Sequence, residues 1–166
     1  MKKIFIYLTL ALAAGFSSCS SDDDQPVGPT NQPSQPTQTD TTPKINYVLA
    51  KNWQITGFGQ GTPGTTTFTD VYKSGFPNCQ KDDIFTFGPS DELTIAPGTN
   101  KCNSGQTEQK GTWNLNNNSS VMTITNPAQT VIGLNGEFSV IEITASKIIL
   151  TQIVNSNQYI LTFSAI

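Results

Sequence analysis

The chain has 166 residues, enough for one domain with additional terminal segments. Nine Lys and twelve acidic residues, with no Arg and no His, give a formal net charge of −3. Nucleic-acid binding is not expected, because no basic surface is available to neutralise phosphate. The commonest general base and the commonest zinc ligand are also missing. We therefore expect no enzymatic activity, cofactor or metal. The many Thr, Asn, Ser, Gln and Gly residues are typical of an extracellular β-protein.

Residues 1–18 have the pattern of a signal peptide. Lys2 and Lys3 precede a mainly apolar run at 4–14, which is too short to span a membrane because a spanning helix needs roughly twenty residues. The small residues directly before Cys19 resemble a bacterial lipoprotein box, in which cleavage leaves Cys19 as the lipidated N-terminus. The alternative is an ordinary cleaved signal followed by an incidental cysteine.

The segment that follows Cys19 is acidic. Ser21, Asp22, Asp23 and Asp24 resemble the export signal of Bacteroidetes surface lipoproteins. The resemblance implies an outer-membrane, lipid-anchored protein exposed at the cell surface, with a periplasm-facing position as the alternative. A plain solvated acidic tract has the same composition.

Residues 19–44 have the composition of a disordered tether. Five prolines and much Thr and Gln accompany Val27, the only large apolar residue after Cys19 in this segment. Such a segment buries too little apolar surface to offset the entropy lost on ordering, so we expect a spacer between membrane and domain. Within it, Thr41 follows Asp40 in a short motif that resembles an O-glycosylation site of Bacteroidetes. A three-residue match also arises by chance.

Residues 45–166 are expected to form one all-β domain. No stretch has a convincing helical period, and strand-length segments alternate with turn signals every eight to twelve residues or so. Ten candidate strands can be marked, one or two more than the barrel of about eight strands that we expect. This excess is within the normal error of strand assignment. The expected strands are residues 49–58, 66–73, 84–87, 93–96, 109–115, 121–125, 130–134, 137–144, 147–154 and 158–163.

Several details of these strands are predicted. Trp53, Ile55 and Gly57 alternate in the first strand and are expected on one face. The strands at 84–87 and 93–96 are expected to pair across the turn at 88–91. Two hairpin turns are also predicted, a strong one at Asn135-Gly136 and a weaker one at 155–157. The last four strands lie too close together in sequence for crossover helices, so they are expected to form an antiparallel meander.

The last strand predicts closure of the sheet. Residues 159–163 carry neither Lys nor Pro to protect an open edge, so this strand needs a neighbour. The strand around Trp53 is the natural partner, which gives an antiparallel up-and-down β-barrel. With about eight strands, the interior is either filled by side chains or holds one small ligand.

Cys79 and Cys102 are expected to form a disulfide. They are the only pair left once Cys19 is lipidated, and the compartment is oxidising. The bond would close a loop of 24 residues and contribute about 3 kcal/mol on the chain-entropy estimate. A redox or metal site would need a CxxC spacing or a nearby histidine, and the sequence has neither.

Four features together resemble a known family. They are Leu49-x-x-x-Trp53, Cys79-Gln-Lys-Asp-Asp-x-x-x-Phe87, the second cysteine at 102, and Gly111-Thr112-Trp113. The combination is similar to the lipocalin-like domain of Bacteroidetes lipoproteins over about residues 46–166. The resemblance implies an up-and-down barrel and, by distant analogy, carriage of an apolar ligand.

Two groups of side chains are candidates for a functional role. Asp82 and Asp83 are adjacent acids, readable as a catalytic pair, a calcium site, or a turn cap bonded to backbone N–H groups. Six aromatic residues line a ligand cavity on one interpretation and simply fill the core on the other; these are Trp53, Phe85, Phe87, Trp113, Tyr159 and Phe163.

The sequence thus predicts a monomeric, membrane-anchored barrel that binds a small apolar or amphipathic molecule in its mouth. The loops at 59–65 and 88–91 are expected to control access to it. The alternative is a barrel with a filled interior that contacts another protein or a glycan, as an accessory or inhibitor-like module.

Overall fold

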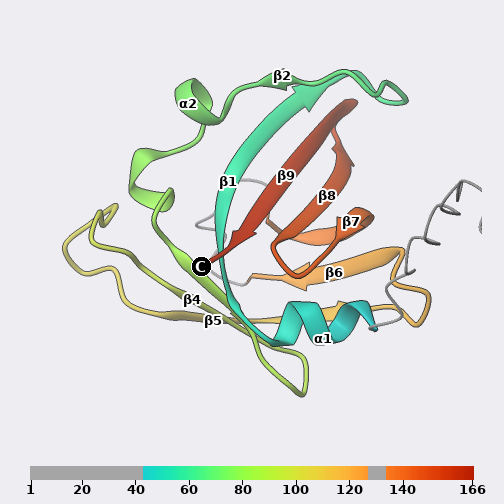
Figure 1. The fold of residues 1–166 in the computed structure, drawn as a ribbon. Coiled ribbons are helices and arrows are strands. Elements are labelled where there is room, and N and C mark those ends of the chain that lie inside the picture. Colours follow the sequence, from blue (N-terminus) through green and yellow to red (C-terminus); the bar gives the residue numbers. More distant parts are fainter. Residues whose placement is uncertain (1–42, 127–133) are drawn as a thin grey trace, which may run out of the picture. The chain divides into compact units, whose positions relative to one another are not determined.

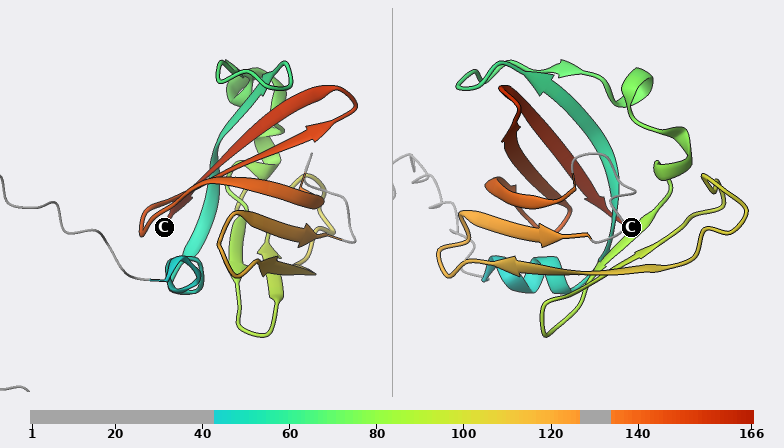
Figure 2. Two further views of the ribbon diagram at one scale, coloured as in Figure 1. Left: turned by 90° about the vertical axis from the view of Figure 1, so that its right-hand side faces the viewer. Right: turned by 180° about the vertical axis from the view of Figure 1, so that it is seen from behind.

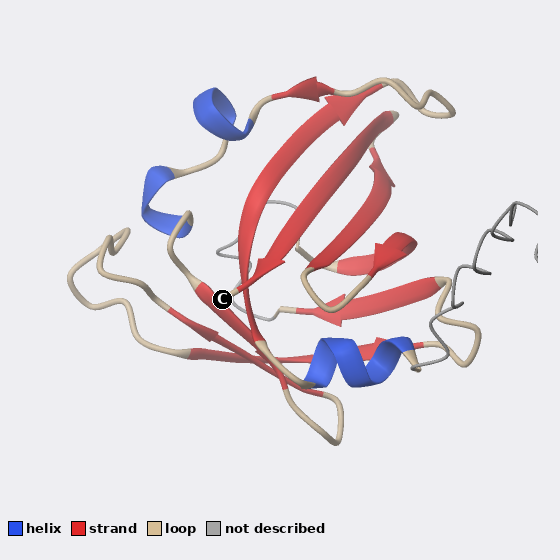
Figure 3. Cartoon of the chain, viewed as in Figure 1, coloured by secondary structure: helices blue, strands red, loops and turns tan. Residues whose placement is uncertain are grey.

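The computed structural model describes residues 43–126 and 134–166. Within these ranges the chain forms nine strands and three short helices (Figure 1; Figure 3). The helices are α1 (Lys44–Leu49), α2 (Tyr72–Gly75) and the 3-10 helix η1 (Asn78–Gln80). The strands are β1 (Asn52–Gly61), β2 (Thr69–Asp70), β3 (Ile84–Phe87), β4 (Glu92–Ala96), β5 (Gln109–Leu115), β6 (Val121–Thr125), β7 (Gly136–Ile143), β8 (Lys147–Val154) and β9 (Asn157–Ala165).

The strands close into an antiparallel barrel (Figure 2). Their order is β1-β3-β4-β5-β6-β7-β8-β9, and β9 returns to β1, so eight strands form the ring while the short β2 pairs only with β1. The closing pair runs from Trp53 opposite Ala165 to Gly61 opposite Gln158. The predicted up-and-down barrel is confirmed, and so is the pairing of the last strand with the strand around Trp53.

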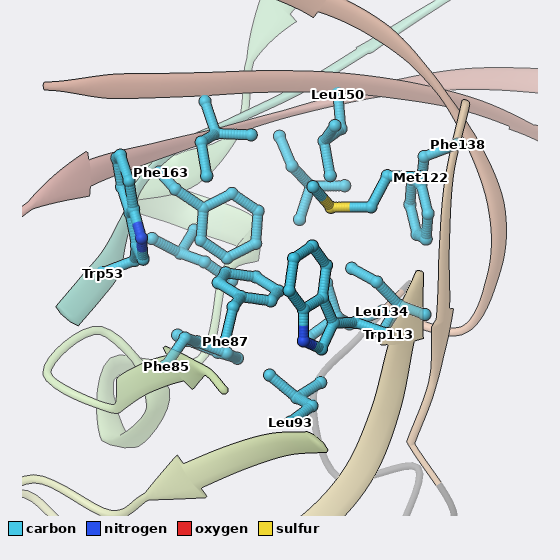
Figure 4. Close-up of a cluster of buried hydrophobic side chains, with 14 of the residues drawn as sticks. Trp53, Phe85, Phe87, Leu93, Trp113, Met122, Leu134, Phe138, Leu150 and Phe163 are labelled. Carbon is cyan, nitrogen blue, oxygen red and sulfur yellow. The ribbon is translucent and has the colours of Figure 1, made fainter. Parts of the chain in front are cut away.

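Aromatic and aliphatic side chains fill the interior of the ring (Figure 4). The rings of Phe85 and Phe163 meet edge to face with centroids 5.4 Å apart, and Phe87 meets Trp113 in the same way at 5.2 Å. These side chains come from β3, β5 and β9, which are distant in sequence, so they meet only because the sheet closes. Edge-to-face contact adds to the free energy that burial of apolar area supplies.

One end of the barrel is covered by α1, and we call it the closed end. Val48 of α1 is fully buried, and its carbonyl oxygen accepts a hydrogen bond from Trp53 Nε1 at 2.9 Å. The helix contacts both β3 and β7, so it lies across this end (Figure 1). Residues 49 and 50, which the sequence places in the first strand, therefore belong to α1 and its cap. Lys44, expected to end the tether, begins the helix.

A β-bulge in β1 changes which residues face the interior. The pairing with β9 shifts between Ile55 and Gly57, where Thr56 is the extra residue. Trp53 and Ile55 point inward as predicted, but after the bulge Phe58 is buried instead of Gly57. The predicted inward position of Gly57 is wrong because one added residue moves every later side chain to the opposite face.

Two of the three predicted hairpin turns are present. The strong signal at Asn135-Gly136 is not a hairpin turn, because Gly136 is the first residue of β7 and pairs with Ile124 of β6. β3 pairs with β4 across residues 88–91, as predicted. The weaker turn signal proves to be a tight two-residue turn, because Asn155 and Ser156 both have positive φ (49° and 63°) and β8 pairs directly with β9. The expected strand at 130–134 lies outside the described residues except for Leu134, which is buried and not in a strand.

The stretch at 66–73 differs most from its prediction. Only Thr69 and Asp70 form a strand, β2, and Tyr72 already begins α2. Asp70 Oδ1 accepts a hydrogen bond from the Tyr72 N–H at 2.9 Å, which turns the chain into the helix. The alternation at 66–73 was therefore a poor guide, because a local side-chain bond competes with the sheet.

We expect Gly111→Ala to destabilise the barrel. A Cβ atom at Gly111 would lie against the carbonyl oxygen of Thr125, which belongs to the neighbouring strand backbone and cannot rotate away. Overpacking of this kind costs about 1–3 kcal/mol, equivalent to a fall in melting temperature of roughly 4–12 °C for a domain of this size.

Thermal unfolding followed by circular dichroism measures the effect. Gly105→Ala is the matched control, since its Cβ would meet nothing closer than Asn103 Oδ1 at 3.7 Å. Equal melting temperatures for the two variants would contradict the close approach of β5 and β6 at Gly111.

Candidate functional site

The candidate site is an apolar pocket at the end of the barrel opposite α1, which we call the mouth. Its volume is about 450 Å³, within the range of small-molecule sites. Strands β1, β8 and β9 supply one side of the pocket, and the segment that includes α2 supplies the other. The lining residues are Phe58, Gln60, Val71, Ser74, Gly75, Val154 and Tyr159.

Two stacked rings form the apolar centre of the pocket. Phe58 on β1 and Tyr159 on β9 lie with centroids 5.7 Å apart and an angle of 5° between their planes. Phe76, which is buried, also contacts Phe58, with ring centroids 5.7 Å apart, and Tyr72 stacks on Phe76 at 5.4 Å. A series of aromatic contacts thus connects the mouth pocket with the segment around α2.

This segment covers a gap in the barrel wall. β1 pairs with β3 only at Asn52 and Trp53, and with β2 only at Gly59 and Gln60. Between these points two carbonyl groups of β1 accept hydrogen bonds from elsewhere: Phe58 O from the Val71 N–H at 2.9 Å, and Ile55 O from the Tyr72 hydroxyl at 2.8 Å. The segment around α2 thus takes the place of a neighbouring strand along this edge.

Burial raises the pKa of the Tyr72 phenol. The hydroxyl therefore keeps its proton across the physiological range and goes on donating to the Ile55 carbonyl. This bond fixes α2 to β1 beside the mouth pocket.

The six aromatic residues predicted as cavity-lining fall into two groups. Tyr159 is half-buried and lines the mouth pocket. The other five are at most 4% exposed, belong to the packed core and do not line that pocket (Figure 4). These five are Trp53, Phe85, Phe87, Trp113 and Phe163.

The predicted disulfide is present beside the barrel wall. Cys79 and Cys102 are bonded, with their Cα atoms 4.9 Å apart. The bond joins η1, which precedes β3, to the loop between β4 and β5. Asn100 Nδ2 also donates to the Asn78 carbonyl at 3.1 Å. The chain on either side of the β3–β4 hairpin is thus held together, as the sequence predicts.

Asp82 and Asp83 bind the same loop. Asp82 Oδ2 accepts hydrogen bonds from the Asn100 N–H at 2.9 Å and the Thr99 hydroxyl at 3.0 Å. Asp83, which is buried, accepts one from the Gly98 N–H at 3.3 Å. Of the interpretations left open by the sequence, the turn cap is the one that these contacts support. A Cβ atom on Gly98 would collide with Asp82, so the loop depends on this glycine.

The two carboxyl groups are shifted in opposite directions. Burial raises the pKa of Asp83, and the charge on Asp82 adds to this, against the bond from Gly98. Burial also acts to raise the pKa of Asp82, but the bonds from Asn100 and Thr99 outweigh it and the pKa is lowered.

Other predicted sites are not represented in the structure. In residues 43–126 and 134–166, no group of three or more Cys, Asp or Glu side chains could hold a metal ion. No helix in the same ranges is long and apolar enough to cross a membrane. The lipidation, export and glycosylation sites lie outside the described residues; they are Cys19, Ser21, Asp22, Asp23, Asp24 and Thr41.

Comparison with known proteins identifies the family. A family model described as the lipocalin-like domain matches residues 49–150. The chain belongs to the lipocalin-like family. The family expected from the sequence is thereby confirmed. A solved structure of a lipocalin-like protein from Bacteroides uniformis ATCC 8492 is similar, with 17% identity and a TM-score of 0.43, over 72% of this chain and 99% of that one. The comparison with curated proteins gave no match.

Most of the pocket of this lipocalin-like chain was missed in the sequence. Val71 falls in the expected strand at 66–73 and Ser74 and Gly75 fall in no expected element, because nothing local predicts that α2 covers an edge of β1. The inward position of Phe58 could have been predicted. Side chains on one face of a regular strand are two residues apart, as Trp53 and Ile55 are, whereas Phe58 follows Ile55 by three. A change of parity within one strand indicates a bulge.

We expect Asp82→Asn and Asp83→Asn to change stability in opposite directions at neutral pH. The folded-state pKa of Asp82 is lowered, so its charge stabilises the fold above the unfolded pKa, and the gain is lost as the pH falls through the folded value. Asn at this position should therefore lower the melting temperature. The pKa of Asp83 is raised, so its ionisation opposes folding above the raised value, and Asn should increase the melting temperature.

Thermal melts at neutral pH and at about pH 3, where both carboxyl groups are largely protonated in the unfolded chain, test this pair. For both variants, the difference in melting temperature from the parent protein should be smaller at about pH 3 than at neutral pH. A difference that is the same at the two pH values would show that the effect comes from shape and not from charge.

Proposed function

We propose that this chain is a lipid-anchored, surface-exposed lipocalin-like protein that binds a small apolar or amphipathic molecule at the mouth of its barrel. The observation that carries the proposal is the mouth pocket, with a stacked pair of aromatic rings, Phe58 and Tyr159, at its centre. The family supports binding of a ligand in general terms, and this pocket supplies a place for it.

The size of the pocket limits the size of the ligand. The interior below the mouth is filled by the aromatic core, so a bound molecule lies in the outer part of the barrel. Its apolar part would lie against Phe58, Tyr159, Val71 and Val154, and its release from water would drive binding at roughly 25 cal/mol per Å² of buried apolar area.

Access to the pocket involves only one of the two predicted loops. The loop after β1 lies at the mouth, where the Gly64 N–H donates to Gln158 Oε1 at 2.9 Å. The turn at 88–91 lies at the closed end, because it follows β3 beyond the pairing of Thr86 with Asn52 (Figure 1). Its predicted role in access is therefore wrong.

The cellular localisation of the protein is part of the same proposal. Cys19 would carry the lipid, the acidic run at 21–24 would direct export to the surface of the outer membrane, and residues 20–44 would act as the spacer. The supporting observations are the signal-like residues 1–18 and the position of Cys19 directly after them.

A second candidate function is a module that contacts a protein or a glycan through its outer face. The filled core favours it, as do Ile141 on β7 and Ile153 on β8, which are 53% and 60% exposed. Retention of no small molecule by the purified protein would favour this candidate over the binding protein.

Replacement of Tyr159 by Ala is expected to weaken binding of an apolar probe. The full-length protein should bind the neutral fluorophore N-phenyl-1-naphthylamine saturably, and loss of the ring stacked on Phe58 should raise the dissociation constant about 5- to 10-fold. Fluorescence titration measures this, with circular dichroism to verify folding. Ile153→Ala, on the outer face, is the control and should bind as the parent does. Absence of saturable binding, or binding unaffected by Tyr159→Ala, would refute the mouth pocket as the site.

Replacement of Cys19 by Ala should release the protein from the membrane. Without the thiol no lipid can be attached, and the remaining apolar segment at 4–14 is too short to span a bilayer. Fractionation of cells into soluble and membrane portions measures the effect, with Ser20→Ala as the neighbouring control that stays in the membrane portion. If both variants remain with the membrane, the anchor does not depend on Cys19.

A further inference from the structure

The mouth pocket has no charged side chain among its described lining residues. Four are apolar or glycine, and the remaining three offer an amide, a hydroxyl and a phenol: Gln60, Ser74 and Tyr159. A carboxylate or an ammonium group placed there would lose water without gaining a partner of opposite charge. The lining is thus suited to neutral polar groups only.

Lys73 lies in α2 and Lys81 contacts that helix, but neither is a lining residue of the pocket. Lys81 is directed elsewhere, since its Nζ donates to Asn78 Oδ1 at 2.8 Å and lies 5.0 Å from the centre of the Tyr72 ring. Lys73 belongs to α2 next to Ser74, but it is exposed and is not a lining residue.

Gln60 provides the polar end of the pocket. Its Nε2 donates to Asn157 Oδ1 at 3.0 Å, which fixes the amide across β1 and the start of β9. Within the described residues its Oε1 makes no hydrogen bond, so this oxygen can accept one from a ligand. The hydroxyl of Ser74, which is exposed on α2, can donate or accept.

The apolar part of the pocket is built around an aromatic pair. Phe58 and Tyr159 lie almost parallel, with ring centroids 5.7 Å apart, and aromatic side chains pack favourably against a ring or an extended apolar chain. An aromatic or extended apolar body and a neutral hydrogen-bonding group are thus the two features that the lining can recognise together.

We infer that the mouth pocket selects uncharged amphipathic molecules, such as neutral alcohols, ketones or amides with an aromatic or extended apolar part, and rejects fatty-acid anions and alkylammonium ions. This inference rests on the proposed function and narrows it to a class of ligand. Gln60 is the residue that sets the selection, because it is the fixed polar group beside the stacked rings.

Matched competitors test the inference on the full-length protein. Dodecanol, dodecanoate and dodecylammonium share one alkyl chain and differ in charge. Each is added to protein loaded with N-phenyl-1-naphthylamine, the alcohol below its solubility limit and the two ions below their micellar concentrations. Dodecanol should displace the probe, and the two ions should need at least about tenfold higher concentrations, because each would be buried without a counterion. In direct titrations, 8-anilinonaphthalene-1-sulfonate, which adds a sulfonate to the skeleton of the probe, should also bind more weakly.

A change of charge at Gln60 tests whether the pocket selects its ligand by charge or only by the apolar character of its lining. Gln60→Lys should admit dodecanoate and the sulfonated probe with affinities about tenfold higher than the parent's, because the ammonium group supplies the missing partner. Gln60→Glu should keep both excluded, and Lys73→Gln should change nothing. All three variants should still bind the neutral probe.

The outcomes distinguish this inference from the function on which it rests. If dodecanoate or dodecylammonium displaces the probe as readily as dodecanol, or if Gln60→Lys gains no affinity for anions, the selection is refuted while the mouth remains a binding site. If the neutral probe itself does not bind, the proposed function fails and the inference fails with it.

Discussion

The pairing of β1 with β9 is the contact on which the rest of the structure depends. It joins the first long strand to the last across nearly the whole chain, from Trp53 opposite Ala165 to Gly61 opposite Gln158. Without it the sheet would have two free edges, and unpaired edges invite association with other chains. With it, aromatic residues of β1, β3, β5 and β9 share one interior, and Phe58 and Tyr159 stand side by side at the mouth. Both the core and the pocket are therefore products of closure.

The other edge of β1 is where the barrel departs from a regular ring. β1 leaves β3 after Trp53, and the α2 segment occupies the space that a strand would fill. That segment leads directly into η1, which the bond between Cys79 and Cys102 ties to the loop after β4. The disulfide thus helps to hold the α2 segment in place beside β1. Val71, Ser74 and Gly75 of this segment line the pocket together with residues of β1, β8 and β9.

The sequence was most informative where one local pattern decides the structure. The strands expected between turn signals at 84–87, 109–115 and 121–125 have the same bounds as β3, β5 and β6, and the lack of edge protection at 159–163 predicted closure. The sequence was least informative where contacts with residues distant in the sequence decide the local structure. Thr66 to Lys73 alternates like a strand, yet β1 accepts only Thr69 and Asp70 as a partner and takes Val71 and Tyr72 through single bonds. The bulge at Thr56 likewise has its cause in the register with β9, although the change of parity before Phe58 leaves a trace of it.

The C-terminal residue of the described domain lies at the closed end of the barrel, beside the start of β1. The N–H of Ile166 donates to the carbonyl of Asn52 at 3.0 Å, just after α1. A fusion partner or affinity tag attached to the C-terminus would consequently project from the end opposite the mouth and leave the pocket unobstructed.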